Sequence, residues 1–168
     1  MISPHSPISE LFVSPESAQK LKVEAGEMPS WDLSARQLCD LELLMNGGFS
    51  PLKGFLGRAD YDRVVEEMRL ADGSLWPMPV TLDVGEAFAA SVEVGQDIAL
   101  RDAEGVILAV MHVTDKWSPD KAREAERVFG ADDRAHPAVK YLHETAGAVY
   151  LGGPVTGLQQ PVHYDFRG

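Results

Sequence analysis

The chain has 168 residues, of which 45% are hydrophobic and 24% are charged, an ordinary globular composition. This length predicts one domain, or one domain with a short appendage, and it allows enough burial to fold without a disulfide or structural metal. The formal net charge is −11. Because affinity for nucleic acids comes mostly from Lys and Arg, this charge argues against a nucleic-acid partner.

The densest group of basic residues forms no basic patch. Lys121, Arg123 and Arg127 alternate with Glu124 and Glu126. Mixed charges at helical spacing are typical of a solvated helix face. We therefore expect these side chains, Glu124 included, to face solvent.

The first 14 residues are polar and contain proline, so they lack the apolar core of a signal peptide. No window approaches about 18 continuous apolar residues, which argues against a membrane span. The single cysteine, Cys39, lies between Leu38 and Leu41 in an apolar pattern and is expected to be a buried core thiol. We expect a soluble, cytoplasmic protein with no membrane partner.

The first half of the chain predicts three helices. Ser14 caps the first, which runs to about Ala25 before Gly26. Ser34 and Gln37 have the spacing of a capping box and begin the second. Apolar residues recur at steps of three and four in the second helix and in a third over about residues 60–70. They are Leu38, Leu41, Leu44 and Met45, then Tyr61, Val64, Val65 and Met68.

The second half predicts a mixture of strands and helices. Residues 94–100 and 106–117 read as strands joined by a hairpin turn. The other expected elements are a strand at 79–84, a helix from Ser118 with Ala122, Ala125, Val128 and Phe129 inward, a helix from His136 to about His143, a strand at 148–151 broken by Gly152-Gly153-Pro154, and a closing strand within 159–167. This order indicates an α+β fold, a small curved sheet or partial barrel decorated with short helices.

Known catalytic patterns are absent from the sequence. It has no Gly-x-Gly, Gly-Lys or Gly-x-Ser-x-Gly motif and no histidine pair three or four residues apart. Asp132 and Asp133 are too few ligands for a metal site. His112 is interpreted as a surface or satisfied core histidine, and His136 as part of a helix start. We therefore assign no catalytic, cofactor-binding or metal-ligating residue to this chain.

One connection combines aromatic, small and turn-forming residues with a lysine. Its candidate interface residues are Asn46, Gly47, Gly48, Phe49, Ser50, Pro51, Lys53 and Phe55. The favoured interpretation is that Phe49 and Phe55 anchor the loop in the core. The alternative is an interface with another domain, since loops on a rigid scaffold often carry function.

At this loop the sequence resembles the amino-terminal region of the ATP sulfurylase (sulfate adenylyltransferase) family. The resemblance begins with residues 36–44 and 46–55 and continues in order to residue 166. Further matching segments are Asp60-Tyr61, residues 73–77, residues 81–84, residues 99–102 with Gly105, Glu124-Ala125, residues 128–130, His136-Pro137, Gly152-Gly153 and residues 163–166. Several matches in the family's order are more specific than any one of them.

The resemblance implies that residues 1–158 form a PUA-like partial β-barrel decorated with short helices. Residues 159–168 would be a closing segment and the start of a linker to a catalytic domain. The family's Gln-x-Arg-Asn-x-x-His-x-x-His motif is absent here. The parent enzyme would transfer the adenylyl group of MgATP to sulfate, giving adenosine 5′-phosphosulfate and pyrophosphate, whereas this chain alone would be an inactive scaffold without a cofactor. The signature also resembles bacterial enzymes with a fused adenylylsulfate kinase.

Two other interpretations remain open. One is an RNA-binding module, which the PUA-like relation suggests and the negative charge disfavours. The other is a domain that sets a homo-oligomer. The partner expected under the main interpretation is the catalytic domain of the same polypeptide.

Overall fold

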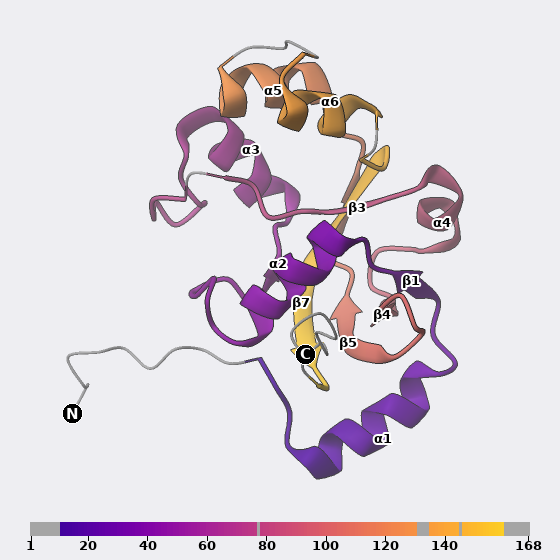
Figure 1. Ribbon diagram of the computed structural model, residues 1–168. Helices are drawn as coiled ribbons and strands as arrows, with labels where there is room; N and C mark the ends of the chain where they lie inside the picture. Colours follow the sequence, from indigo (N-terminus) through magenta and orange to yellow (C-terminus); the bar gives the residue numbers. More distant parts are fainter. Residues whose placement is uncertain (1–10, 77, 131–134, 145, 160–168) are drawn as a thin grey trace, which may run out of the picture. The chain divides into compact units, whose positions relative to one another are not determined.

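The computed structural model describes residues 11–76, 78–130, 135–144 and 146–159 (Figure 1). The chain forms two compact units, each built from separate stretches of sequence. Unit 1 contains residues 1–54, 96–112 and 154–168, and unit 2 contains residues 55–95 and 113–153. The expected closing strand falls almost wholly on residues outside the described part of the chain.

The sheet of unit 1 is built on a hairpin. Strand β4 (Asp97–Arg101) pairs antiparallel with β5 (Ile107–His112), so the predicted hairpin is confirmed. The short strand β1 (Ser30–Asp32), which the sequence did not reveal, runs parallel to β4, and the end of β7 (Val149–Gly157) pairs antiparallel with β5. In the turn, the Asp102 carboxylate accepts the amides of Glu104 and Val106, both at 2.9 Å.

Two capped helices complete unit 1, as predicted. In α1 (Pro15–Ala25) the Ser14 hydroxyl accepts the amide of Ser17 at 3.3 Å. In α2 (Ala35–Met45) Ser34 and Gln37 form a reciprocal capping box. The Gln37 side chain also accepts the indole N–H of Trp31 at 3.0 Å, which fixes α2 to β1. The core between α1 and the sheet consists of Ala18, Ala25, Ala99, Val110 and Leu158.

The prediction that Cys39 is buried is wrong, since its thiol is exposed. The buried residues of α2 are Gln37, Leu41, Leu44 and Met45. Cys39 lies two residues, about 200° of helical rotation, from both Gln37 and Leu41, and therefore faces the other way.

Unit 2 has the first part of β7 at its centre. Strands β3 (Leu82–Val84) and β6 (Asp115–Trp117) both pair antiparallel with it, and Leu151 of β7 lies opposite Leu82 on one side and Lys116 on the other. The chain passes between the units at β2 (Gly54–Phe55). The predicted break at Gly152-Gly153-Pro154 is wrong because β7 runs through it. Gly152 is needed for a close approach, since a Cβ there would lie 2.7 Å from the Cα of Gly57.

The described residues of unit 2 also form four helices. They are α3 (Arg58–Glu67), α4 (Glu86–Ser91), α5 (Lys121–Phe129) and α6 (Pro137–Glu144). Helices α5 and α6 lie side by side around Ala125, Val139 and Leu142 (Figure 1). Helix α3 packs against α5 and β6.

The structure corrects several predicted elements of unit 2. Helix α4 was not predicted, and the strand expected over residues 106–117 is divided into β5 and β6. Ala122, expected to face inward, is exposed. The apolar pattern correctly placed Tyr61 and its two valine neighbours in the core, but Met68 lies beyond the end of α3 in a left-handed conformation and is exposed. Among the described helices, none is long and apolar enough to cross a membrane.

Candidate functional site

The predicted interface loop begins where α2 ends and is closely held by hydrogen bonds. Asn46 is the C-cap of α2, and its side-chain oxygen accepts the amide of Gly48 at 2.8 Å. The amide of Phe49 donates to the Leu43 carbonyl at 3.0 Å. Gly47 has a φ of 86°, which glycine adopts without strain. The loop therefore has a defined conformation with little freedom to reorganise.

The loop buries some of its side chains and exposes others. Phe55 is only 2% exposed, so the prediction that it anchors the loop is confirmed, whereas Phe49 and Ser50 are half-buried. Pro51 and Lys53 are exposed. The remaining residues of the predicted set are Asn46, which is half-buried, Gly47, which is buried, and Gly48, which is exposed. The exposed side chains that the loop offers to a partner are those of Pro51 and Lys53.

The histidines that the structure describes have structural partners. The Nδ1 atom of His112 lies 2.7 Å from the Asp97 carboxylate on the surface of the β4–β5 hairpin. The Nδ1 atom of His136 accepts the amide of Ala138 at 3.2 Å at the start of α6. Both observations agree with the predictions. No cluster of metal-ligating side chains occurs among the described residues, and Asp132 and Asp133 lie outside them.

A buried carboxylate is the main polar feature that the sequence did not reveal. Glu124 is 6% exposed, so its prediction as a solvated residue is wrong. Its Oε1 atom accepts hydrogen bonds from the phenol hydroxyls of Tyr61 and Tyr150, the second at 2.9 Å. Helix α5 is thereby attached to α3 and β7 through one oxygen atom.

The two phenol rings that bind this carboxylate pack against each other and against Trp117. The ring centroids of Tyr61 and Tyr150 are 5.4 Å apart in an edge-to-face arrangement. The Trp117 ring lies 5.4 Å from Tyr61 and 5.8 Å from Tyr150. Edge-to-face pairs contribute packing energy beyond the area that they bury. We call Glu124, Tyr61, Tyr150 and Trp117 the Glu124 cluster.

The electrostatics of the Glu124 cluster favour a structural role. Burial, and then the neighbouring charge of Glu124, raise the pKa of the Tyr61 and Tyr150 phenols far above their usual value. Both hydroxyls therefore stay protonated and donate at neutral pH. Burial lowers the pKa of Lys121, whose ammonium donates to the carbonyl of Ala146 at 3.0 Å. A proton donor whose pKa lies so far from neutrality is poorly suited to acid–base catalysis.

One signal in the sequence pointed to Glu124. Glu124-Ala125 is among the segments that match the family resemblance, although the charges around it favour a solvated face. Ala125 is fully buried, so the residue beside it lies at the edge of the core-facing side of α5. The charge pattern alone could not show that two phenols, 63 and 26 residues away in sequence, would reach this position.

A shallow pocket of about 280 Å³ lies beside α4 and β6 in unit 2. Its lining residues are Glu86, Ala89, Ala90, Lys116, Trp117, Ser118 and Val149. The Lys116 ammonium donates to the carbonyls of Ala89 and Val92 at 3.0 and 2.8 Å. Because it caps the end of α4 in this way, an anion in the pocket would have to compete with those carbonyls for its charge.

Comparison with known proteins gives consistent matches over nearly the whole chain. A family described as a PUA-like domain matches residues 2–160. The chain is 49% identical over 168 residues to a sulfate adenylyltransferase of Eremothecium gossypii, covering 99% of this chain and 33% of the relative. It is 43% identical over 172 residues to the sulfate adenylyltransferase of Saccharomyces cerevisiae, covering 100% of this chain and 34% of the relative. The chain thus spans about a third of the length of these relatives.

A solved structure gives the same pattern of coverage. It is described as a hexameric APS kinase from Thiobacillus denitrificans, with 35% sequence identity and a TM-score of 0.73. The match covers 98% of this chain and 28% of the solved chain. The likeness is therefore to one part of a much longer polypeptide.

Proposed function

Since this chain belongs to the PUA-like domain family, we propose that it is the non-catalytic amino-terminal domain of a sulfate adenylyltransferase. The observation that carries the proposal is the coverage, because relatives with this activity match 99–100% of this chain over about a third of their own length. Residues 1–158 would be the domain, and residues 159–168 its closing segment and the start of a linker. The domain would act as a scaffold for a catalytic part elsewhere in the polypeptide.

The parent reaction transfers an adenylyl group. A sulfate oxygen attacks the α-phosphorus of ATP, the bond from that phosphorus to the bridging oxygen breaks, and pyrophosphate leaves with its electron pair. Such a reaction depends on positioning and on stabilising charge around phosphorus, with Mg²⁺ bound to the nucleotide. In unit 2 the ammonium groups of Lys116 and Lys121 already donate hydrogen bonds to backbone carbonyls. The catalytic groups would therefore belong to the rest of the enzyme.

A second activity in the same polypeptide is a further part of the proposal. The solved chain described as an APS kinase is more than three times as long as the region that this chain matches, since only 28% of it is covered. An adenylylsulfate kinase domain fused to the adenylyltransferase would phosphorylate the product of the first reaction. Kinase activity of the complete protein on adenosine 5′-phosphosulfate tests this part separately.

Sulfate-dependent release of pyrophosphate from ATP tests the main proposal. The complete protein should release pyrophosphate only when sulfate is present, and the 168-residue chain should release none. Turnover by the purified 168-residue chain, or no turnover by the complete protein, would contradict the proposal. Tight, salt-sensitive binding of structured RNA at low salt would favour the RNA-binding alternative. A solution mass of the 168-residue chain well above that of a monomer would favour the oligomerisation alternative.

The interface loop is proposed to contact the catalytic part of the enzyme. Its hydrogen-bonded backbone and its exposed Pro51 and Lys53 support this role. Amine labelling followed by mass spectrometry provides the test, with the exposed Lys20 on α1 as the matched control. Lys53 should react several-fold more slowly in the complete protein than in the 168-residue chain, whereas Lys20 should react equally in both. Equal reactivity of Lys53 in the two proteins would remove the loop from the interface.

A further inference from the structure

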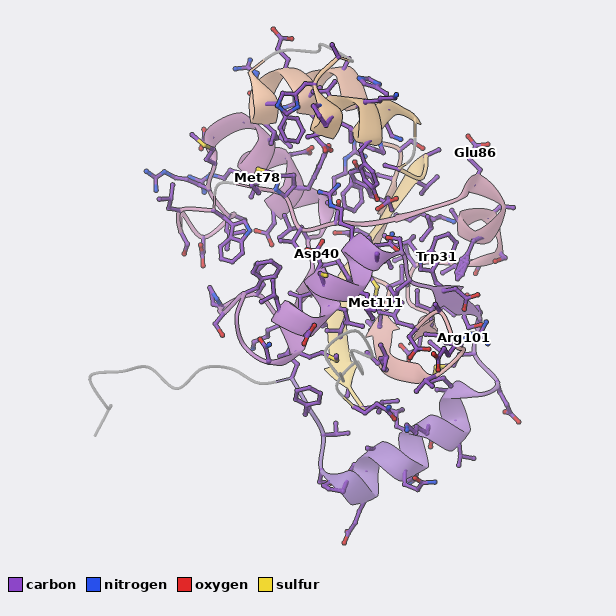
Figure 2. The ribbon with its side chains drawn as sticks, in the orientation of Figure 1. Trp31, Asp40, Met78, Glu86, Arg101 and Met111 are labelled. Atoms are coloured by element: carbon purple, nitrogen blue, oxygen red, sulfur yellow. The ribbon has the colours of Figure 1, made fainter. Side chains whose placement is uncertain are left out.

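Exposed apolar side chains gather in the connection between α3 and β3. Met68 is 52% exposed, Leu75 is 65% exposed and Met78 is 42% exposed. We call residues 68–76 together with Met78, which is labelled in Figure 2, the apolar loop. Single exposed apolar residues are ordinary on protein surfaces, but several in one short segment are typical of a surface that binds another domain or protein.

The apolar loop has one defined backbone conformation. The amide of Trp76 donates to the Met68 carbonyl at 2.7 Å. The amide of Ala71 donates to the Asp60 carboxylate at 2.7 Å, and its carbonyl accepts from the Arg63 guanidinium at 2.8 Å, so the loop is tied to α3. A surface held in this way loses little conformational entropy when a partner binds.

Met68 is also in an unfavourable backbone conformation. It is the C-cap of α3, with φ 56° and ψ 38°, and among the described residues it is the only non-glycine residue with a positive φ. Helices usually end in this conformation with glycine, because a Cβ there is strained. Half of the Met68 side chain is nevertheless in solvent. Neither the backbone conformation nor the burial of this position explains why it is a methionine in the isolated chain. The side chain therefore points to a contact with something outside this chain.

We propose that the apolar loop is a docking surface for the remaining part of the sulfate adenylyltransferase polypeptide. This inference rests on the proposed function. The relatives are about three times as long as this chain, so about two thirds of such an enzyme would be available as the partner. Three side chains cover far less than the roughly 1,200 Å² of a stable interface between free proteins. A tethered domain needs less, because its effective concentration is in the millimolar range.

A second copy of the chain is the weaker candidate for this surface. Each copy carries a formal charge of −11, so two copies repel one another at low ionic strength. The apolar loop contains one basic residue, Arg69, and one acidic residue, Asp72, so it has no net positive charge to offset that repulsion. The tethered partner needs no such compensation.

Oxidation of methionine by dilute hydrogen peroxide, read by mass spectrometry, tests the proposal directly. In the 168-residue chain Met68 and Met78 should oxidise fast, whereas the fully buried Met45 and Met111 should oxidise slowly and so report that the chain is folded. In the complete protein Met68 and Met78 should oxidise at least about fivefold more slowly, in proportion to the solvent exclusion expected at a packed interface. Met45 and Met111 should remain slow.

Two variants separate docking from folding. In the complete protein, Leu75→Ser should restore much of the fast oxidation of Met78, because the interface loses an apolar contact. The matched control is Val94→Ser, since Val94 is also exposed in unit 2 but lies outside the apolar loop. Met68→Gly should leave the melting temperature of the 168-residue chain unchanged or raise it, because glycine relieves the left-handed strain.

The outcomes distinguish this inference from the proposed function. Equal oxidation of Met68 and Met78 in the two proteins, with sulfate-dependent pyrophosphate release intact, would overturn the docking surface and leave the enzyme assignment standing. Protection that disappears on dilution of the complete protein would overturn it in favour of a second copy. A complete protein without that activity would overturn both.

Discussion

Replacement of Glu124 by alanine tests whether the Glu124 cluster holds α5 in place. The substitution leaves the buried hydroxyls of Tyr61 and Tyr150 without the acceptor they share. Each buried polar group that loses its partner costs about 1–3 kcal/mol, so the expected loss is about 4 kcal/mol. That is a large share of the roughly 5–15 kcal/mol that stabilises an ordinary domain.

Glu126→Ala is the matched control for this substitution. Glu126 lies on the same helix and is exposed. Both changes add the same intrinsic helix propensity, so the difference between the variants isolates the buried contacts. Surface substitutions of this kind usually change stability by less than about 0.5 kcal/mol.

Urea unfolding of the 168-residue chain, followed by tryptophan fluorescence and circular dichroism, provides the measurement. With an m-value of about 2 kcal/mol/M, the Glu124→Ala midpoint should fall by about 2 M relative to the Glu126→Ala midpoint. Trp117 lies against both tyrosine rings and should report the loss of packing. Midpoints within about 0.3 M of each other would refute the reasoning that these hydroxyls depend on Glu124.

Three other predictions concern pH, packing and thiol exposure. Because folding raises the phenol pKa of Tyr61 and Tyr150 above the usual value of 10.0, the unfolded chain loses these protons first. The contribution of the two phenols to stability should therefore be constant below pH 10. Above pH 10 it should be lost by up to about 1.4 kcal/mol per pH unit for each phenol in alkaline unfolding curves; a curve that stays flat between pH 10 and pH 12 would contradict this. Gly152→Ala should destabilise the folded chain by about 3 kcal/mol or more, since the added Cβ would clash with neighbouring backbone. The control is Gly26→Ala, which should be neutral or slightly stabilising in the same unfolding assay because Gly26 has a φ of −61°. Cys39 should react completely with a thiol reagent under native conditions, and a thiol that reacts only after unfolding would show that it is buried.

Local signals in the sequence were sufficient for the capped helices and the hairpin. Ser34 and Gln37 are three residues apart, and the two hydrogen bonds of the box that they form lie within the first turn of the helix. The hairpin of β4 and β5 is likewise decided by a short turn in which Asp102 holds two amides. Such elements are predictable because the interactions that select them lie within a few residues.

Contacts between distant segments decided the features that the sequence did not reveal. The sequence predicts that Gly152 breaks the strand. The structure shows instead that a glycine is needed there because the backbone of Gly57 passes close beside it. The charge pattern of α5 predicts that Glu124 faces solvent. Its burial depends on hydrogen bonds from two tyrosines that lie on other elements. The interface loop is a mixed case, since its composition correctly predicted that Phe55 is buried but did not show that Lys53 is exposed.

The ion pairs that Arg101 and Arg123 form on the protein surface support the proposed scaffold role more than the net charge does alone. Arg101, labelled in Figure 2, holds the carboxylate of Asp32 at 2.8 Å across β4 and β1. Arg123 in unit 2 is engaged in the same way by Glu66, with its Nε atom at 2.6 Å. A nucleotide phosphate would have to displace a carboxylate from either guanidinium and approach a chain with a formal charge of −11. Because these two arginines already stabilise pairs of elements in the fold, neither is free to bind a phosphate or sulfate group without breaking an ion pair.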